Sequence, residues 1–314
     1  MSAPTDPAGE SVALEALLLA RARLYALFHK LFGAAPDAAV LEALLGGATA
    51  DAVDEYAEDD ETMHGFGRFL SEVAAAEGRA ALLEAARDEH VRVLVGPGAL
   101  PAIPWEAPYR TGEPTVFQED TLAVRAAYRA RGVQPRKMQR VPDDHVSLEC
   151  AFMAREARFS LAQLIAGDVC ALAAGLRAQQ SFVVEHMTAW LGEYAKGLRR
   201  SATAVLYPQA AEALAAFVAL DATFLAEAAL WAEEVSASGE RFEALGAVVG
   251  SPEGLAFAAA TYAPAASPPS VVNKNKGNSE IIVIIRPHLD PGAADDPPRR
   301  LFLTGPQPSH AASS

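Results

Sequence analysis

The chain has 314 residues, 51% hydrophobic and 21% charged, so it is long and apolar enough to bury a full core. Its 40 Asp and Glu residues outnumber 26 Lys and Arg residues, which gives a formal net charge of -14. Such a chain is a poor binder of nucleic-acid phosphates and would attract a cationic partner instead. The two cysteines, Cys150 and Cys170, have no zinc-ligand spacing, and two free thiols suit a reducing compartment.

No targeting or membrane segment is recognised in the sequence. The apolar stretch at 12–20 contains Glu15 and lacks the positive region that precedes a secretory signal. No uninterrupted apolar run reaches the roughly 18 residues of a membrane helix. We therefore expect a cytoplasmic protein with no stable membrane insertion.

Helical periodicity covers most of the chain up to residue 262. After a polar arm at 1–10, which we expect to be flexible, apolar residues recur at three- and four-residue spacing from Ser11 to Phe32. Further helices are predicted at 37–45, 62–76, 78–95, 117–131, 142–165, 169–198 and 205–235. Because no alternation typical of strands accompanies them, we predict an all-α fold with one compact, bundle-like domain over 11–262.

Residues 263–314 differ in composition from the helical part. They are rich in Pro, Ser, Gly and Asn, and we expect most of this tail to be disordered. One run at 280–286 has strand-like composition but no obvious partner strand. An arginine pair at 299–300 lies far from the N-terminus, so it is not interpreted as an export signal of this chain.

A long proline-rich loop interrupts the helices at 96–116. Its five prolines and three glycines exclude a helix, and loops of this length tend to be functional or mobile. Residues 104–109 (PWEAPY) suit peptide recognition, because proline lowers the ordering cost of binding and Trp and Tyr are enriched in hot spots. The alternative is that Trp105 pins the loop onto the helices while Glu106 is merely solvated.

Residues 142–149 (PDDHVSLE) place two aspartates, a histidine and a glutamate within two helical turns. Asp143 can cap the helix, and His145 and Glu149 share one face because they are four residues apart. A metal site is one interpretation, although no HExxH motif or repeated Glu-x-x-His pair supports it. The plainest alternative is a capped helix start with a structural histidine.

No motif of an enzyme is present, since GxGxxG, Walker A, GxSxG and CxxC patterns are all absent. We therefore expect no catalysis and no bound cofactor or metal. The alternative from another class is a helical metal-dependent hydrolase that would use Asp143, Asp144, His145 and Glu149.

Taken together, these segments resemble the TorD/DmsD family of cytoplasmic chaperones for molybdenum-containing redox enzymes. The matches run in order over about 11–235 and comprise Arg23-Leu24-Tyr25, 89–97 (EHVRVLVGP), 103–109 (IPWEAPY), 142–153 (PDDHVSLECAFM), Phe182, His186, Met187 and Trp190. The departures are mild: Ile103, Ala107 and Cys150 stand where the family has proline, serine and leucine. The tail matches nothing in the family.

The resemblance implies a chaperone that binds the twin-arginine signal peptide of a molybdopterin-containing oxidoreductase. Such chaperones hold the apo form of their client in the cytoplasm until its cofactor is inserted, before export through the twin-arginine translocation (Tat) pathway. An assembly factor of the NarJ kind, serving a cytoplasmic nitrate reductase, is a related alternative. The chaperone would be a monomer or a dimer.

The same resemblance implies a leader-binding site with two parts. Carboxylates would meet the guanidinium pair through charge-assisted hydrogen bonds, and an aromatic and aliphatic groove would take the apolar stretch. The residues expected to bind the leader are Pro104, Trp105, Glu106, Tyr109, Asp143, Asp144, His145, Leu148, Glu149 and Phe152.

Overall fold

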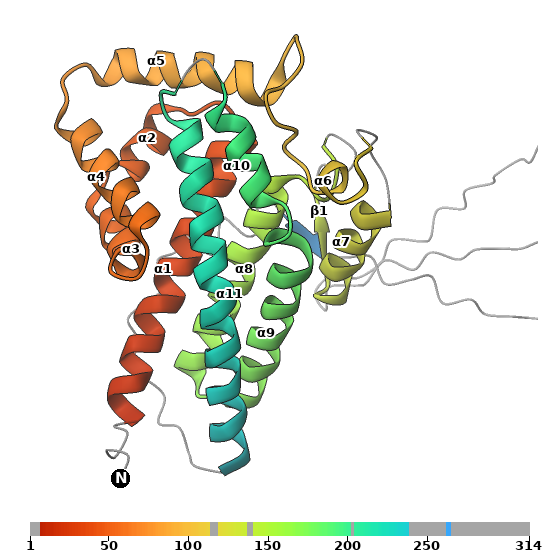
Figure 1. Ribbon diagram of the computed structural model, residues 1–314. Helices are drawn as coiled ribbons and strands as arrows, with labels where there is room; N and C mark the ends of the chain where they lie inside the picture. The colour runs from red at the N-terminus through yellow and green to blue at the C-terminus, as the bar shows by residue number, and fades with distance from the viewer. Residues whose placement is uncertain (1–6, 114–118, 137–140, 202–203, 239–261, 265–314) are drawn as a thin grey trace, which may run out of the picture. The chain divides into compact units, whose positions relative to one another are not determined.

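The computed structural model describes residues 7–113, 119–136, 141–201, 204–238 and 262–264 (Figure 1). Helices make up most of these residues, which confirms the predicted all-α fold. Most of the tail, including the strand-like run within it, lies outside the described residues.

The helices follow one another with short connections (Figure 1). They are α1 (Pro7–Gly33), α2 (Ala38–Leu44), α3 (Gly47–Ala57), α4 (Glu61–Ala75), α5 (Arg79–His90), α6 (Ala107–Thr111), α7 (Glu119–Ala130), α8 (Val146–Ala166), α9 (Val169–Phe182), α10 (Leu191–Arg199) and α11 (Tyr207–Ser238). Two π-helical segments, η1 (Val91–Val95) and η2 (Val183–Met187), directly follow α5 and α9.

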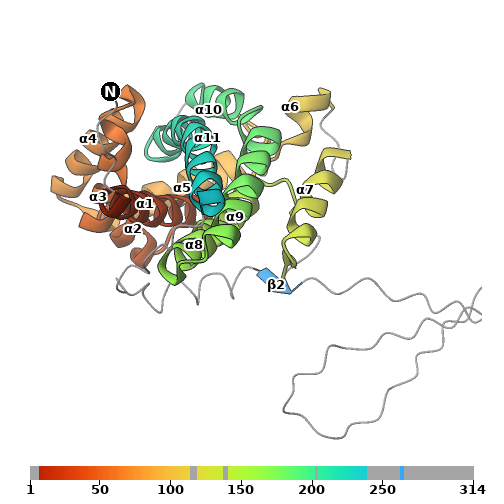
Figure 2. The ribbon, with the colours of Figure 1, turned by 90° about the horizontal axis from the view of Figure 1, so that it is seen from below.

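Four long helices form the centre of the fold. Helix α1 packs along α8, and α9 contacts both α8 and α11 (Figure 2). Helix α10 packs on α11, while α3 and α4 pack on each other and reach α1 and α11 respectively. The periodic apolar face of α1 is buried here, and Tyr25 packs edge-on against Phe217 with 4.7 Å between ring centroids. Burial of these apolar faces is the main driving force for the arrangement.

Side-chain caps define several helix starts. Asp37 accepts the N–H of Val40 at 2.8 Å, and Asp168 accepts the N–H of Ala171 at 3.0 Å. Helix α8 ends at Gly167, whose φ of 71° is a left-handed conformation that glycine adopts without strain.

The start of α8 corrects one expectation. The helix begins at Val146 rather than at residue 142, and its N-cap is His145, whose Nδ1 accepts the N–H of Ser147 at 3.1 Å. Asp143 does not cap the helix, because its carboxylate is paired with Arg125 instead.

Four other elements differ from the periodicity-based prediction. Helix α3 was not expected, and α6 lies inside the loop predicted to be non-helical. Pro108 is compatible with α6 because a first-turn residue needs no N–H partner. The helix predicted at 169–198 is divided by η2, where Thr188 donates its N–H to the Val183 carbonyl at 3.0 Å. Helix α1 begins at Pro7, inside the arm expected to be flexible.

A short antiparallel ladder joins β1 (Val133–Pro135) to β2 (Tyr262–Pro264), with Val133 opposite Pro264. The second strand lies at the boundary that the sequence predicts between the helical domain and the tail.

Helix α11 is the one described helix that is long and apolar enough to cross a membrane, with a mean hydropathy of 1.8 in its most apolar window. Its apolar residues are interrupted by Glu212, Asp221 and Glu227. In this fold α11 packs against α9 and α10, and its Asp221 forms a buried ion pair with Arg21 of α1. Both features are typical of a core helix.

Candidate functional site

The two motifs singled out in the sequence lie side by side. The Glu106 N–H donates to the Asp144 carbonyl at 3.1 Å, and the Val146 N–H donates to the Pro104 carbonyl at 2.9 Å. Trp105 and His145 face each other across the resulting β-bridge. Residues 104–112, here called the strap, are therefore fixed by backbone hydrogen bonds to the segment that leads into α8.

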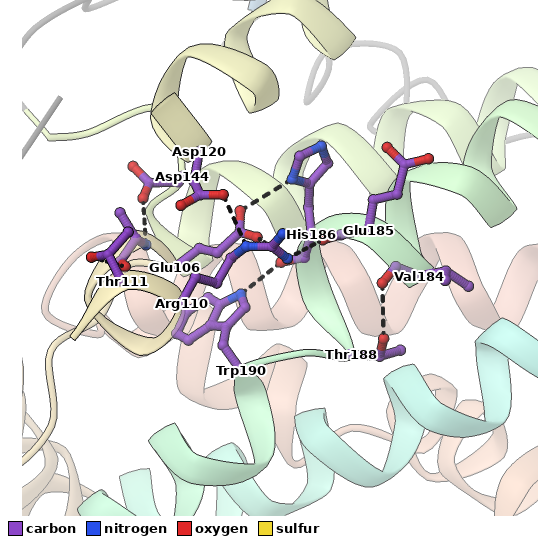
Figure 3. Close-up of polar contacts among 11 residues, drawn as sticks. Glu106, Arg110, Thr111, Asp120, Asp144, Val184, Glu185, His186, Thr188 and Trp190 are labelled. Atoms are coloured by element: carbon purple, nitrogen blue, oxygen red, sulfur yellow. Dashed lines mark hydrogen bonds and ion pairs between the residues drawn. The ribbon is translucent and has the colours of Figure 1, made fainter. Parts of the chain in front are cut away.

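The side chain of Asp144 also holds the strap. Its Oδ2 accepts the Ala107 N–H at 2.9 Å, so this carboxylate satisfies a free donor at the start of α6 (Figure 3). Burial raises the pKa of Asp144 above its usual value, against the opposing effect of that N–H. Asp143 makes a different contact, because its Oδ2 accepts two hydrogen bonds from Arg125 at 2.5 and 2.8 Å.

Glu106 comes from the strap and has no solvent exposure. Its Oε2 lies 3.1 Å from His186 Nδ1, and its Oε1 lies 3.3 Å from Arg110 Nη1 (Figure 3). Burial raises the pKa of Glu106, while His186 and Arg110 lower it. The His186 carbonyl accepts the indole N–H of Trp190 at 2.7 Å, so η2 and the residues after it position the histidine.

Glu149, in the first turn of α8, is also fully buried. Among the described residues, neither of its carboxylate oxygens has a hydrogen-bond partner. Burial raises the pKa of Glu149 well above its usual value, and Glu106 and Asp144 raise it further; the Trp190 indole opposes this only in part. Ionisation of Glu149 is therefore more costly in the free protein than in water.

Glu106, Asp144 and Glu149 are here called the acid site. Four carboxylate oxygens of this site have no hydrogen-bond partner within the described part of the chain: Glu106 Oε1, Asp144 Oδ1 and both oxygens of Glu149. Buried polar atoms without partners are uncommon in folded proteins, and each carries a desolvation cost. The acid site is thus rich in acceptors and poor in donors.

His145 is a neutral helix cap. Its Nδ1 lies 2.9 Å from the Ser147 hydroxyl, and burial lowers the pKa of its imidazole to about 3. The plainest interpretation of this histidine, a structural one, therefore fits its surroundings.

The apolar residues expected at the site fall into two groups. Trp105, Tyr109 and Leu148 are half-buried, and Tyr109 packs on Trp190 with 5.4 Å between ring centroids. Phe152 is buried in the core, where its ring lies 4.7 Å from that of Phe182. Pro104 is buried within the strap. Only the first group can contact a ligand without repacking the core.

The residues proposed for a metal-dependent hydrolase are directed to separate partners. Asp143 binds Arg125, and His145 binds Ser147. No three His, Cys, Asp or Glu side chains in the described ranges are grouped so that they could hold a metal ion. The geometry gives the hydrolase alternative no support.

Sequence reasoning missed two contributors to the site, Arg110 and Asp120. His186 was recognised only through the family-like spacing of Phe182, His186 and Trp190, without a role. Their contacts join segments far apart in the chain, so no local pattern indicates them. Glu89 begins the family-like stretch at 89–97, and no role was predicted for it. In the structure it accepts the N–H groups of Val205, Leu206 and Tyr207 at the start of α11.

Comparisons with known proteins place the acid site inside a family-like region. Residues 54–196 match the family model described as nitrate reductase delta subunit. Over 70 residues the chain is 36% identical to the Tat proofreading chaperone DmsD of Salmonella paratyphi A and of Salmonella typhi, covering 21% of this chain and 34% of each relative. The DmsD of Salmonella typhimurium is 39% identical over 54 residues, which cover 17% of this chain and 26% of the relative.

These matches confirm the resemblance that the motifs indicate. Each aligned stretch spans about a third or less of the length of the curated relatives. The family model, in contrast, extends from α3 into α10 and so includes the strap, the start of α8 and η2.

Proposed function

We propose that this protein, which matches the nitrate reductase delta-subunit family over residues 54–196, is a chaperone that binds the twin-arginine leader of a molybdopterin oxidoreductase. It would hold the apoenzyme in the cytoplasm until the cofactor is inserted, before export through the Tat pathway. It would catalyse no reaction itself. The relatives described above are Tat proofreading chaperones, which supports this class of function.

The observation that carries the proposal is the acid site. Its unpaired oxygens are buried at a point that the family-like motifs build, and an incoming cation would complete their hydrogen bonds. A guanidinium suits this role because it offers five donors in a planar fork and remains charged at any physiological pH. Two adjacent arginines bring two such forks.

The ligand would need the strap to move, because the three carboxyl groups of the acid site are buried and Glu106 belongs to the strap itself. The strap is held by two backbone hydrogen bonds and by Asp144. Side-chain contacts of Glu106 with His186 and of Arg110 with Asp120 and the Glu185 carbonyl add to these, so opening would exchange them for contacts with the ligand. The apolar part of the leader would then contact Trp105, Tyr109 and the exposed Val184. Asp143 and His145 would act indirectly, by holding the segment before α8 in position.

The test uses a synthetic peptide with an arginine pair followed by apolar residues, and a lysine-pair version of it. By isothermal titration calorimetry, Glu106→Gln is expected to weaken binding of the arginine peptide about tenfold or more, the scale of a charge-assisted contact at ~1.5–3 kcal/mol. The lysine peptide should bind weakly to both proteins, since an ammonium lacks the planar fork.

The matched control is Glu42→Gln on α2, where an exposed glutamate is lost with the same change in net charge. It should leave both affinities unchanged. Equal losses in the two variants would mean that only the general negative field attracts the peptide. Failure of the parent protein to bind the arginine peptide would refute the proposed function.

The name of the matching family model favours a second candidate, an assembly factor for a cytoplasmic nitrate reductase. Its client segment need not carry an arginine pair. Binding of an N-terminal peptide from such a reductase, unaffected by Glu106→Gln, would favour this function over leader recognition.

A further inference from the structure

The side chain of Arg110 bridges three elements at the edge of the acid site. It projects from the short helix α6, and Gly112, with a φ of 76°, closes that helix by donating its N–H to the Pro108 carbonyl. The start of this short helix is held by Asp144.

Three acceptors from different parts of the chain surround this guanidinium (Figure 3). Nε lies 2.9 Å from Asp120 Oδ1 on α7, and Nη1 donates to the Glu185 carbonyl of η2 at 2.9 Å. Nη1 also lies 3.3 Å from Glu106 Oε1, an ion pair that does not satisfy hydrogen-bond geometry, since this oxygen remains without a hydrogen-bond partner.

The burial of the partners is unequal. The Arg110 side chain is 41% exposed, whereas that of Glu106 has no exposure. An ion pair with one exposed member is weak and easily exchanged, because water screens the charge and the long side chain regains entropy when released. The buried carboxylate, in contrast, cannot lose its cation without cost. The site therefore favours exchange of one guanidinium for another.

We propose that Arg110 is a built-in substitute for an arginine of the ligand: it occupies the acid site in the free protein, and an incoming arginine displaces it. This inference rests on the proposed function. Displacement sets a threshold for binding, because a ligand must replace contacts with Glu106, Asp120 and the Glu185 carbonyl. A second guanidinium can reproduce these contacts, whereas an ammonium is a point charge with a different geometry. Arg110 is thus a specificity-determining residue.

The first experiment measures peptide affinity by calorimetry for Arg110→Gln, which removes the charge and keeps a polar side chain. We expect the arginine-pair peptide to bind about tenfold more tightly, equal to ~1.4 kcal/mol. The affinity for the lysine-pair peptide should rise by a larger factor, so that the ratio of the two affinities becomes smaller than in the parent protein. Unchanged or weaker binding of the arginine peptide would overturn the proposal.

The second experiment needs no peptide. Arg110→Ala leaves space beside Glu106 and Asp120, and millimolar ethylguanidinium is expected to raise its melting temperature relative to the parent protein. Arg177→Ala is the matched control, because Arg177 has a similar side-chain exposure of 43% and pairs with Glu233. Stabilisation equal to that of Arg177→Ala would overturn the proposal.

The two experiments separate the possible failures. Selective rescue by ethylguanidinium without peptide binding by any variant would refute the proposed function but leave the guanidinium site supported. In the opposite case the parent protein binds the arginine-pair peptide, while ethylguanidinium fails to stabilise Arg110→Ala and Arg110→Gln shows no higher affinity. That result would refute the displacement role of Arg110 and support the chaperone function.

Discussion

Two fully buried carboxyl groups, Asp221 on α11 and Glu149 on α8, differ in their hydrogen-bond and ion-pair partners. Asp221 forms an ion pair with Arg21, from which its Oδ2 also accepts a hydrogen bond at 3.1 Å, and it accepts the Tyr25 hydroxyl at 2.7 Å. Gln179 binds the same guanidinium at 3.0 Å. Within the described ranges Glu149 has no hydrogen-bond partner for either oxygen.

The difference indicates which acid serves the fold. Asp221, whose two oxygens both have partners, fixes the packing of α1, α9 and α11. Removing either Asp221 or Arg21 would leave the remaining charge buried without a counter-charge. A buried acid without partners contributes a cost to the free protein, so folding gives no reason to keep it. Such a residue is better explained by a contact made only in a complex. Stability and binding measurements on the two acids should therefore move in opposite directions.

The largest expected effect is on Asp221. Asp221→Asn leaves Arg21 buried without its counter-charge and should lower the free energy of unfolding by about 3–5 kcal/mol, measured by urea denaturation. Affinity for the arginine-pair peptide should be unchanged under conditions where the variant is folded. The double variant Arg21→Met with Asp221→Leu should recover most of the stability, because it removes both charges. If the double variant were as unstable as the single one, the ion pair would not be the cause.

Glu149 should behave in the opposite way. Glu149→Met removes unpaired buried oxygens and should raise the free energy of unfolding by about 1–3 kcal/mol at pH 8. The same variant should bind the arginine-pair peptide more weakly. The folded-state pKa of Glu149 is raised, so the native protein retains a proton that the unfolded chain releases. Stability of the parent protein should therefore fall as pH rises above the ordinary glutamate value, by up to about 1.4 kcal/mol per pH unit.

Denaturation at pH 5 and pH 8 checks this prediction, since the advantage of the variant should grow with pH. Glu149→Gln, which keeps polar atoms in place, is the control and should gain less. Destabilisation of Glu149→Met at both pH values would show that the glutamate has a structural role after all.

His145 offers a smaller effect that sharpens the comparison, because it is a neutral buried group beside the acid site. His145→Ala should cost about 1 kcal/mol through the lost cap of α8, whereas His145→Asn should keep most of it. The folded pKa of about 3 lies below the ordinary value of 6.5, so parent stability should fall as pH drops from 6.5 towards 3.

Both variants should show a shallower loss over this range in acid denaturation. The loss should not vanish, because burial also lowers the pKa of His29 to about 4. An unchanged slope in both variants would mean that His145 is not the group responsible.

The smallest expected effect uses the chain's own sequence as a probe. Arg299 and Arg300 are followed by Leu301, Phe302 and Leu303, so this segment has the arginine pair and apolar run that the acid site is proposed to recognise. A synthetic peptide of residues 297–306 should compete weakly with the probe peptide in a fluorescence assay. Its twin-lysine version should not compete. If the peptide competed equally well on Glu106→Gln and on the parent protein, it would not be binding at the acid site.

Much of the fold was predictable because helix periodicity and capping are local. The apolar spacing in α1 and the Gly-Pro-Gly stretch after η1 predicted their boundaries within a few residues. Helix α3 was missed because most of its apolar residues are alanines, and only Val53 and Tyr56 are larger. The break at η2 depends on a π turn that periodicity does not report.

The site was predictable in composition but not in geometry. The two motifs could be chosen from residue types, and the structure places them side by side through the Glu106 to Asp144 and Val146 to Pro104 hydrogen bonds. That these bonds bury the acids could not be deduced, since burial depends on where the strap packs. The contacts of His186 and Arg110 likewise arise only from tertiary structure.

The pairing of Arg21 with Asp221 also constrains the order of events during synthesis. The two residues are 200 positions apart, so at about 5–20 residues per second the arginine waits roughly 10–40 s for its partner. Until α11 has left the ribosome, α1 and α9 present a charged gap where the finished protein has a neutral core. Nascent chains stalled before residue 207 should therefore be cleaved readily by protease, and chains that include α11 should resist. Docking of α11 thus acts as the closing step of folding for this part of the chain.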